Sequence, residues 1–248
     1  MSFPLPKVII SSVFSSASKN YITYNNMSDC CRSGIIVGGI YNTIEKNIIS
    51  KCGDGIYGGI DVYSSHNIIS NNTFLKSGII IRAYPNKIVN NIVNGKPIIY
   101  IENSENIELN GRTAGQIILA NCSKITISDV SINHTCVGLQ LLASNHCCIL
   151  NNNFSENGIG IKCNGSYNLI INNSIEKNGD CGIWCDGSFN RIEENKIVSN
   201  KFQGMYVTRN NIVIWNNISR NLYNGLRLGG DNNIVENNIV SYNGLDGI

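Results

Sequence analysis

The chain has 248 residues, of which 42% are hydrophobic and 15% charged, and its formal net charge at pH 7 is +2. A net charge this small gives no reason to expect nucleic acid or an anionic membrane surface as a partner. No apolar run approaches the roughly 20 residues of a membrane-spanning helix, so no membrane insertion is expected.

Residues 1–19 are the first distinct segment. They contain Pro4 and Pro6 and only a short apolar stretch after Lys7, which makes a poor secretion signal. We expect an atypical first coil or an N-terminal cap of the repeats; the alternative is the cut end of a longer chain. The repeat domain is predicted to cover residues 20–248.

Short apolar segments led by glycine begin after residue 20, with irregular spacing and an insertion at residues 58–63. If these segments are strands, the residues between the inward-facing positions point outward. The outward residues then form an apolar column of Ile36, Tyr57, Ile80 and Ile99. We expect this column to be covered by residues 1–17, by a loop or by a partner chain, because large exposed apolar patches are rare.

Residues 136–248 repeat one pattern at a step of about 22 residues, which indicates an array of one structural unit. Each unit has a glycine followed by an apolar-x-apolar segment. The glycines are Gly138, Gly160, Gly182, Gly204 and Gly225. An Asn-x-apolar signal keeps the same step, at Asn152, Asn173, Asn195, Asn216 and Asn237.

Each unit is predicted to consist of strands and turns, because period-two apolar alternations rich in isoleucine and valine are separated by Asn, Gly and Ser. We therefore predict an all-β fold, a parallel β-helix of roughly ten coils of 20–23 residues. Equivalent strands stack at about 4.8 Å. Asparagines in register are expected to form a ladder along the axis; the alternative is that Asn and Ile are abundant through genome composition.

A family resemblance appears where the regular spacing breaks. Its segments are GKPIIYIENSENIEL (residues 95–109) and AGQIILANCSKITISDVSI (residues 114–132). They resemble the central signature of the NosD-like periplasmic copper-binding proteins, which carry carbohydrate-binding-and-hydrolase-type (CASH) repeats. The resemblance implies a single-stranded right-handed parallel β-helix, a pectate-lyase-like solenoid, and a role in maturing the copper enzyme nitrous-oxide reductase. A shared scaffold does not fix function.

A surface column is expected on the regular coils, because the middle residue of each glycine-led segment points outward. The column consists of Gln140, Lys162, Trp184, Tyr206 and Arg227. Sugar rings stack on aromatic side chains, and cations meet the carboxylates or sulfates of acidic glycans. We therefore predict ligand binding on this column; the alternative is an ordinary amphipathic exposed face.

Weak catalytic candidates are Asp180 and Asp186, which bracket Trp184, with Arg209 and Asp231 one and two coils beyond Asp186. A polysaccharide lyase, hydrolase or epimerase needs carboxylates, or a carboxylate with a basic partner, that converge on the sugar. Asp180 and Asp186 lie at opposite ends of a short strand, which places them far apart for a shared proton.

No metal site and no cofactor are expected. His134 with Cys136, and His146 with Cys147 and Cys148, supply ligands suited to copper or zinc, but there is no Cys-x-x-Cys pair. Cys163 and Cys185 are one repeat apart and should stack in the core as buried, reduced thiols.

These patterns favour a non-catalytic β-helix scaffold that binds glycans or a protein partner along its long face. The alternatives are a carbohydrate-active enzyme and a copper-enzyme maturation factor. Because the sequence stops at Ile248 within a coil, we also expect truncation, a capping partner or end-to-end assembly of copies. The expected location is extracellular or in the cell envelope.

Overall fold

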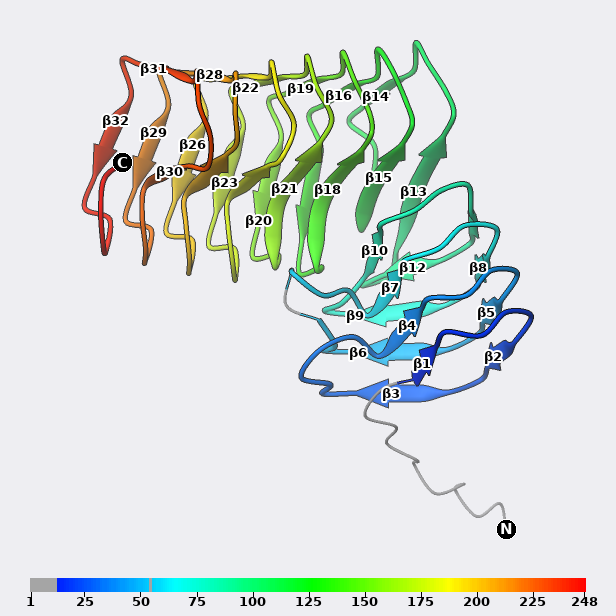
Figure 1. Cartoon of the computed structure of the whole chain (residues 1–248). Helices are drawn as coiled ribbons and strands as arrows, with labels where there is room; N and C mark the ends of the chain where they lie inside the picture. The colour runs from blue at the N-terminus through cyan, green and yellow to red at the C-terminus, as the bar shows by residue number, and fades with distance from the viewer. Residues whose placement is uncertain (1–12, 54) are drawn as a thin grey trace.

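The computed structural model describes residues 13–53 and 55–248, and every regular element in them is a β-strand (Figure 1). Equivalent strands of successive coils pair in parallel and in register, which gives a β-solenoid of about ten turns. The predicted all-β parallel β-helix is confirmed. The described residues contain no helix long and apolar enough to span a membrane.

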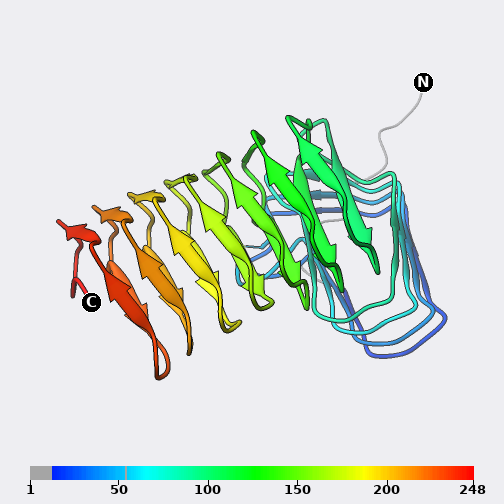
Figure 2. The same cartoon turned by 90° about the horizontal axis from the view of Figure 1, so that it is seen from above.

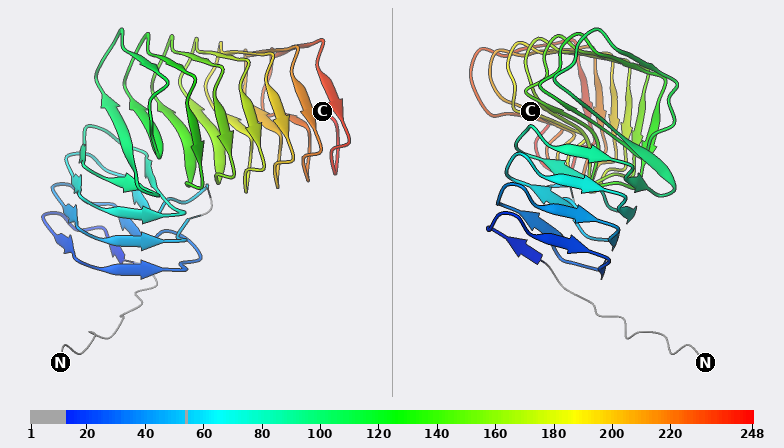
Figure 3. Two further views of the ribbon diagram at one scale, coloured as in Figure 1. Left: turned by 180° about the vertical axis from the view of Figure 1, so that it is seen from behind. Right: turned by 90° about the vertical axis from the view of Figure 1, so that its right-hand side faces the viewer.

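The coils form two stacks that point in different directions and meet at an elbow (Figures 1 and 3). The first stack contains strands β1 to β12. Its first column is β1 (Val13–Ser15), β4 (Ile35–Val37), β7 (Ile60–Val62) and β10 (Ile79–Ile81). Its second is β2 (Tyr21–Thr23), β5 (Thr43–Glu45), β8 (Ile68–Ser70) and β11 (Lys87–Val89), and its third is β3 (Asn26–Ser28), β6 (Ile48–Ser50), β9 (Thr73–Leu75) and β12 (Ile92–Val93).

The second stack contains strands β13 to β32 and extends away from the first (Figure 2). One column is β13 (Lys96–Glu102), β15 (Gln116–Ala120), β18 (Val137–Leu142), β21 (Ile159–Asn164), β24 (Ile183–Cys185), β27 (Met205–Val207) and β30 (Leu226–Leu228). The next is β14 (Glu108–Asn110), β16 (Thr126–Ser128), β19 (Cys148–Leu150), β22 (Leu169–Ile171), β25 (Arg191–Glu193), β28 (Ile212–Ile214) and β31 (Ile234–Glu236). The third is β17 (Ser131–Asn133), β20 (Asn153–Ser155), β23 (Ser174–Glu176), β26 (Lys196–Val198), β29 (Asn217–Ser219) and β32 (Ile239–Ser241).

A tight hairpin makes the elbow. Strands β12 and β13 pair antiparallel, with Ile92 opposite Pro97 and Val93 opposite Lys96. The two residues between them, Asn94 and Gly95, have φ values of 48° and 79°. Asn-Gly is the pair that two-residue hairpin turns prefer, because both turn residues need positive φ. The antiparallel pairing reverses the chain, and a new stack begins. From the sequence we predicted one repeat domain over residues 20–248, without this change of direction.

Asparagine side chains connect the coils, as predicted. In each ladder a backbone N–H donates to the Oδ1 of the asparagine one coil further, as in Asn173 to Asn195 at 2.9 Å. This ladder runs from Asn152 through Asn216 to Asn238. We predicted Asn237 for the last position of this ladder, but the position is held by the next residue, Asn238. Asn237 is a turn residue with φ of 55°.

The first stack has the same kind of ladder, but its last acceptor comes from the second stack. Asn20, Asn42 and Asn67 each donate a backbone N–H to the next asparagine. The N–H of Asn86, where the ladder would continue, donates instead to Oε2 of Glu102 at 3.0 Å. Glu102 lies at the end of β13, so this ladder ends on the other side of the elbow.

The apolar column predicted for the N-terminal half is only partly correct. Asp61, not Tyr57, is the register partner of Ile36 and Ile80. Ile80 is fully buried against Cys136, Val137 and Ile159 of the second stack. Ile99 lies in β13 and packs against the core of the second stack. Of the cover predicted from residues 1–17, residues 1–12 lie outside the described part; residues 13–15 form β1.

Candidate functional site

One column of side chains runs across the whole outer face of the sheet that starts with β13. Its register partners in order are Tyr100, Ile118, Gln140, Lys162, Trp184, Tyr206 and Arg227. The five residues predicted to stand in line, Gln140 to Arg227, do so. Their role in ligand binding stays a prediction.

The start of this column closes the open end of the first stack. Ile118 is fully buried in the core of the first stack, and Tyr100 packs against that core. Gln140 was expected on the surface, but it is only 3% exposed. The prediction that Gln140 belongs to an exposed strip is therefore wrong, because the end of the first stack covers it.

Gln140 and Gln116 act as substitutes for a missing strand next to β10. Gln140 Oε1 accepts the N–H of Ile81 at 3.1 Å and its Nε2 donates to the carbonyl of Ile81 at 2.6 Å. Gln116 makes the same pair of bonds with Ile79, at 3.0 and 2.7 Å. A side-chain amide carries one acceptor and two donors, so it can satisfy both backbone groups of an edge residue.

The rest of the column is partly exposed and forms a strip in which two rings lie between two cations, called the recognition strip below. Its members are Lys162, Trp184, Tyr206 and Arg227. Lys162 Nζ lies 5.9 Å from the centroid of the Trp184 ring, and the Arg227 guanidinium lies 5.8 Å from that of Tyr206. The Trp184 and Tyr206 rings are 5.2 Å apart and inclined at 52°. Each cation–π contact at a partly exposed site contributes about 0.5–1 kcal/mol.

At the elbow the strip meets a small cavity of about 280 Å³, called the elbow pocket. Its lining combines polar groups of the second stack with the end of β10. The lining residues are Ile81, Arg82, Gln140, Leu141, Leu142, Lys162, Asn164 and Asp186. Sequence reasoning missed Arg82, because its position depends on how the two stacks meet.

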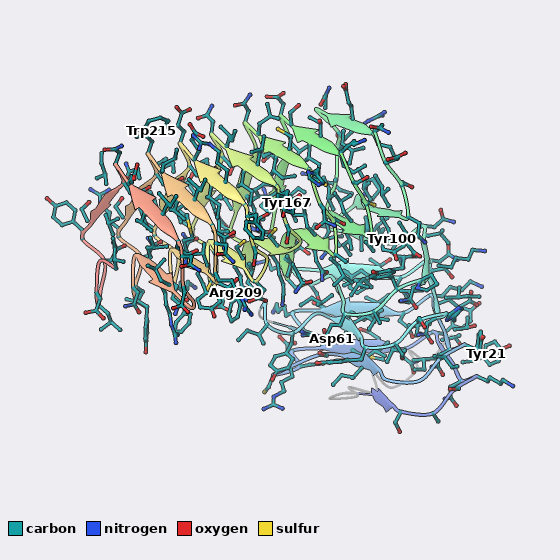
Figure 4. The ribbon with its side chains drawn as sticks, turned by 45° about the horizontal axis from the view of Figure 1, so that its top comes forward. Tyr21, Asp61, Tyr100, Tyr167, Arg209 and Trp215 are labelled. Carbon is teal, nitrogen blue, oxygen red and sulfur yellow. The ribbon has the colours of Figure 1, made fainter. Side chains whose placement is uncertain are left out.

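Arg82 is held in the pocket wall by a buried carboxylate. Asp61 is fully buried, and its Oδ1 lies 3.2 Å from Arg82 Nη2 (Asp61 is labelled in Figure 4). Asp61 Oδ2 accepts hydrogen bonds from the Ser33 hydroxyl at 2.7 Å and the Gly58 N–H at 3.3 Å. Burial raises the pKa of Asp61, and these bonds and Arg82 oppose that rise. Arg82 also donates to the carbonyl of Ile56 at 2.7 Å, which further fixes its orientation.

Lys162 is the other cation of the pocket. Partial burial is the largest cause that lowers its pKa, and the positive charge of Arg82 lowers it further. Asp186 and Asp61 raise the pKa of Lys162, but by less. Asp186 is exposed at the rim. The pocket therefore presents two cationic groups, Arg82 and Lys162, and its environment destabilises the charged form of Lys162.

The predicted catalytic pair does not converge. Asp186 lines the elbow pocket, whereas Asp180 is 8% exposed at the opposite end of β24 and accepts a contact from Cys181 Sγ at 3.6 Å. Arg209 and Asp231 are exposed and do not line this pocket (Arg209 is labelled in Figure 4). Only Asp186 of this set has a place beside the cations.

A wider cleft of about 640 Å³ lies where the turns of the two stacks face each other. Its lining includes Lys76 of the first stack and Lys177 and Lys201 of the second. His134 Nε2 lies 3.3 Å from Glu156 Oε2 at the same place. This histidine therefore pairs with a carboxylate.

An aromatic stack on the turns was also missed. His146, Tyr167 and Phe189 occupy left-handed turn positions in successive coils, with neighbouring ring centroids 5.1 Å apart and planes within 8° of parallel (Tyr167 is labelled in Figure 4). Their recurrence at the step of the repeat is the signal that could have found them. Tyr167 and Phe189 are each 51% exposed, so this stack presents more ring surface to solvent than the half-buried Trp184 and Tyr206. Its rings face one another, and among the described residues no cation–π contact flanks them as it does in the recognition strip.

No group of three or more metal-ligating side chains converges within residues 13–53 and 55–248. Cys163 and Cys185 are free thiols and fully buried register partners, as predicted. Of the two candidate segments considered and set aside in the sequence, His146 stacks on Tyr167 and Cys147 is buried in the core.

Comparison with known proteins supports the fold. A family model described as the right-handed β-helix region matches residues 110–221, which supports a right-handed parallel β-helix family. No curated protein matches the chain. Among solved structures, the chain is similar to a variant of the periplasmic alginate epimerase AlgG at 14% identity and a TM-score of 0.36. That match covers 85% of this chain and 61% of the epimerase.

A second solved structure with some similarity is the A-module of the Azotobacter vinelandii mannuronan C-5 epimerase AlgE6. It matches at 11% identity and a TM-score of 0.31, over 97% of both chains. At these scores neither likeness carries a conclusion about substrate or activity. The NosD-like resemblance stays a prediction.

Proposed function

We propose that the protein binds an acidic glycan along the recognition strip, as a non-catalytic scaffold. The observation that carries this proposal is the unbroken line of Lys162, Trp184, Tyr206 and Arg227, in which two rings lie between two cations. Aromatic faces bind the apolar faces of sugar rings, and the flanking cations attract carboxylates or sulfates. A rigid parallel sheet holds these groups in place before the ligand arrives, which lowers the entropic cost of binding.

The test is binding of acidic polysaccharides on a glycan array, followed by titration with the best ligand. We expect Trp184→Ala/Tyr206→Ala to weaken binding at least ten-fold, because stacking on both rings is lost. A matched control is Trp215→Ala/Tyr242→Ala, which removes two exposed rings outside the strip and should leave affinity unchanged. Unchanged affinity in the strip variant, or equal loss in both variants, would show that the strip is not the binding surface.

A carbohydrate-active enzyme is the second candidate, and the lowered pKa of Lys162 beside Arg82 favours it. Lowering the pKa of a lysine increases the fraction of its amine that is neutral and can act as a general base. In a uronate, Arg82 would neutralise the carboxylate while neutral Lys162 takes the adjacent C5 proton. In a lyase the released electron pair forms the C4–C5 double bond, the C4–O bond breaks and the leaving oxygen takes a proton from solvent. In an epimerase C5 is instead protonated from the opposite face.

Two measurements separate binder from enzyme. A lyase produces ultraviolet-absorbing unsaturated uronates, and an epimerase incorporates deuterium at C5 from D₂O. If either occurs, we expect the rate to rise with pH through the pKa of Lys162 and to vanish in Lys162→Met. Absence of both signals on a polysaccharide that binds the strip would leave the scaffold function. Turnover that survives Lys162→Met would exclude Lys162 as the base.

We place the protein in the cell envelope or outside the cell, where acidic glycans accumulate. Cell fractionation with an antibody tests this location. End-to-end assembly of copies also stays a proposal, which sedimentation velocity at several concentrations tests. The copper-maturation role rests on the resemblance alone, and metal analysis of protein purified without chelators tests it.

A further inference from the structure

We propose that the elbow pocket binds the carboxylate of a terminal sugar, so that the protein recognises the end of an acidic glycan and not its interior. This inference rests on the proposed glycan binding along the recognition strip. It is carried by three features of the elbow: a blocked strip, a pair of cations and a pocket of limited size.

The recognition strip is blocked at one end by the protein itself. The next residue in register before Lys162 is Gln140, and its side chain is bonded to the backbone of Ile81. Before it, Ile118 is buried in the core of the first stack. A sugar chain that follows the strip toward the elbow therefore meets β10 and cannot continue. At the other end Arg227 is exposed, and its strand β30 lies at the far end of the second stack from the elbow (Figure 1).

The blocked end is the place where the two cations meet. Lys162 and Arg82 both line the elbow pocket, one from each stack. Asp61 lies behind Arg82, is fully buried and has its oxygens bonded to Ser33, Gly58 and Arg82, so a ligand meets the guanidinium and not this carboxylate. Asp61 and the carbonyl of Ile56 engage the Nε and Nη2 side of the guanidinium, so a ligand carboxylate would bind through the Nη1 side of an arginine that is already oriented.

The remaining polar groups fit the other part of a sugar acid. Asp186 and Asn164 are exposed on the rim of the pocket and can accept or donate hydrogen bonds to hydroxyl groups. A cavity of about 280 Å³ is small among ligand sites, which suits one sugar residue and not a folded-back chain. Trp184, the next residue of the strip, would take the following sugar.

The first experiment measures how many protein molecules bind one glycan chain. Oligogalacturonates of increasing length, from about the length of the strip to several times that length, are titrated by calorimetry, with oligomannuronates as a second series. End recognition predicts one protein per free chain end at every length. A stoichiometry that rises in proportion to chain length would overturn end recognition while leaving glycan binding intact. If no acidic glycan binds at all, the proposed function fails, and the two failures are thereby distinguished.

The second experiment tests the cations. Asp61→Asn/Arg82→Gln removes the arginine without leaving a buried carboxylate unpaired, so folding is expected to survive. We expect this variant to bind an oligouronate at least ten-fold more weakly than the wild type, yet to bind the carboxyl-reduced oligosaccharide as the wild type does. The control Lys76→Gln/Lys177→Gln removes two cations from the wider cleft and should change neither affinity. Equal weakening by this control, or no weakening by the Arg82 variant, would contradict a carboxylate subsite at the elbow.

Discussion

The two stacks are built from the same kind of coil, but the number of residues per coil is more regular in the second stack than in the first. In the second stack the steps between ladder asparagines are 21 or 22 residues throughout. In the first stack they are 22, 25 and 19 residues. The differences in length fall in the turns between strands, whereas the strands themselves stay in register. Register is therefore set by inward apolar residues and ladder asparagines, and loop length can vary between them.

The stacks also differ in what happens at their ends and on their outer faces. The last coil of the first stack is closed by the second stack through Ile118, Gln116 and Gln140. The outer column of the second stack thus changes role along its length: it is core at Ile118, a hydrogen-bonding cap at Gln140 and an accessible strip from Lys162 onward. The same strand position serves three purposes because the neighbouring stack covers only its beginning.

The largest expected effect is on the free energy of unfolding, when a glycine in each stack is replaced by alanine. A Cβ on Gly182 would lie 2.6 Å from the carbonyl oxygen of Gly204, whereas a Cβ on Gly34 would lie 3.1 Å from that of Gly59. Backbone atoms cannot move aside easily, so we expect Gly182→Ala to lower the free energy of unfolding by about 3 kcal/mol and Gly34→Ala by about 1 kcal/mol. Urea titration followed by circular dichroism measures both.

Gly179→Ala is the matched control for this comparison. Its Cβ would have its nearest neighbour at 3.6 Å, an ordinary contact. We expect a change within about 0.5 kcal/mol. If Gly34→Ala destabilises the protein as much as Gly182→Ala does, the two stacks do not differ in packing precision.

The next effect concerns the cap on the first stack. Gln140→Ala leaves the N–H and the carbonyl of Ile81 without their partner, at a cost of about 2 kcal/mol in total. Hydrogen exchange at residues 79–81 should accelerate more than exchange in β24, because the damage is local to the first stack. Gln203→Ala is the control, since Gln203 is also buried but lies within the second stack. Equal acceleration in both variants would contradict a specific cap.

The smallest effect is a pH dependence at the elbow. Burial raises the pKa of Cys136 from 9.0 to about 12. Below pH 9 this thiol is neutral in the folded and unfolded chains, so its contribution to the free energy of unfolding is fully present. Between pH 9 and about 12 only the unfolded chain ionises, so the free energy of unfolding falls by about 1.4 kcal/mol per pH unit.

Cys136→Ala should make the free energy of unfolding fall less steeply with pH above pH 9, because one titrating thiol is removed. Gly179→Ala, which changes no titratable group, should leave the slope as it is. Urea titrations at pH 8, 9 and 10 measure both slopes. An unchanged slope in Cys136→Ala would mean that water reaches the thiol at the elbow in the folded protein.

Much of the candidate site could be predicted from spacing alone. The nearly constant step of the repeat places Lys162, Trp184, Tyr206 and Arg227 in one line, because strands in a parallel solenoid pair without slippage. The prediction for Gln140 was wrong about exposure, since its position in the strand says nothing of a second stack lying on it. Arg82 was missed because it belongs to another region of the chain, and its distance to Lys162 depends on the angle of the elbow.

One signal at the elbow was present in the sequence and was not used. Asn94-Gly95 follows the apolar pair Ile92-Val93 and precedes Lys96-Pro97 and a further apolar run, and Asn-Gly between two such segments is the pattern of a two-residue hairpin. It predicts a reversal of the chain there, in place of a continuous stack. It does not predict where the new stack will lie, because a hairpin fixes the local pairing of two strands and not the packing of the later coils.

The sequence by itself determined the coil, the ladders and the line of side chains on the outer face, because each depends only on residues that recur at a constant step. Tertiary structure alone decided which part of that line is accessible and which groups face its blocked end. The reason is physical: register is a local property of paired strands, whereas the burial of Gln140 and the approach of Arg82 to Lys162 result from packing between two stacks.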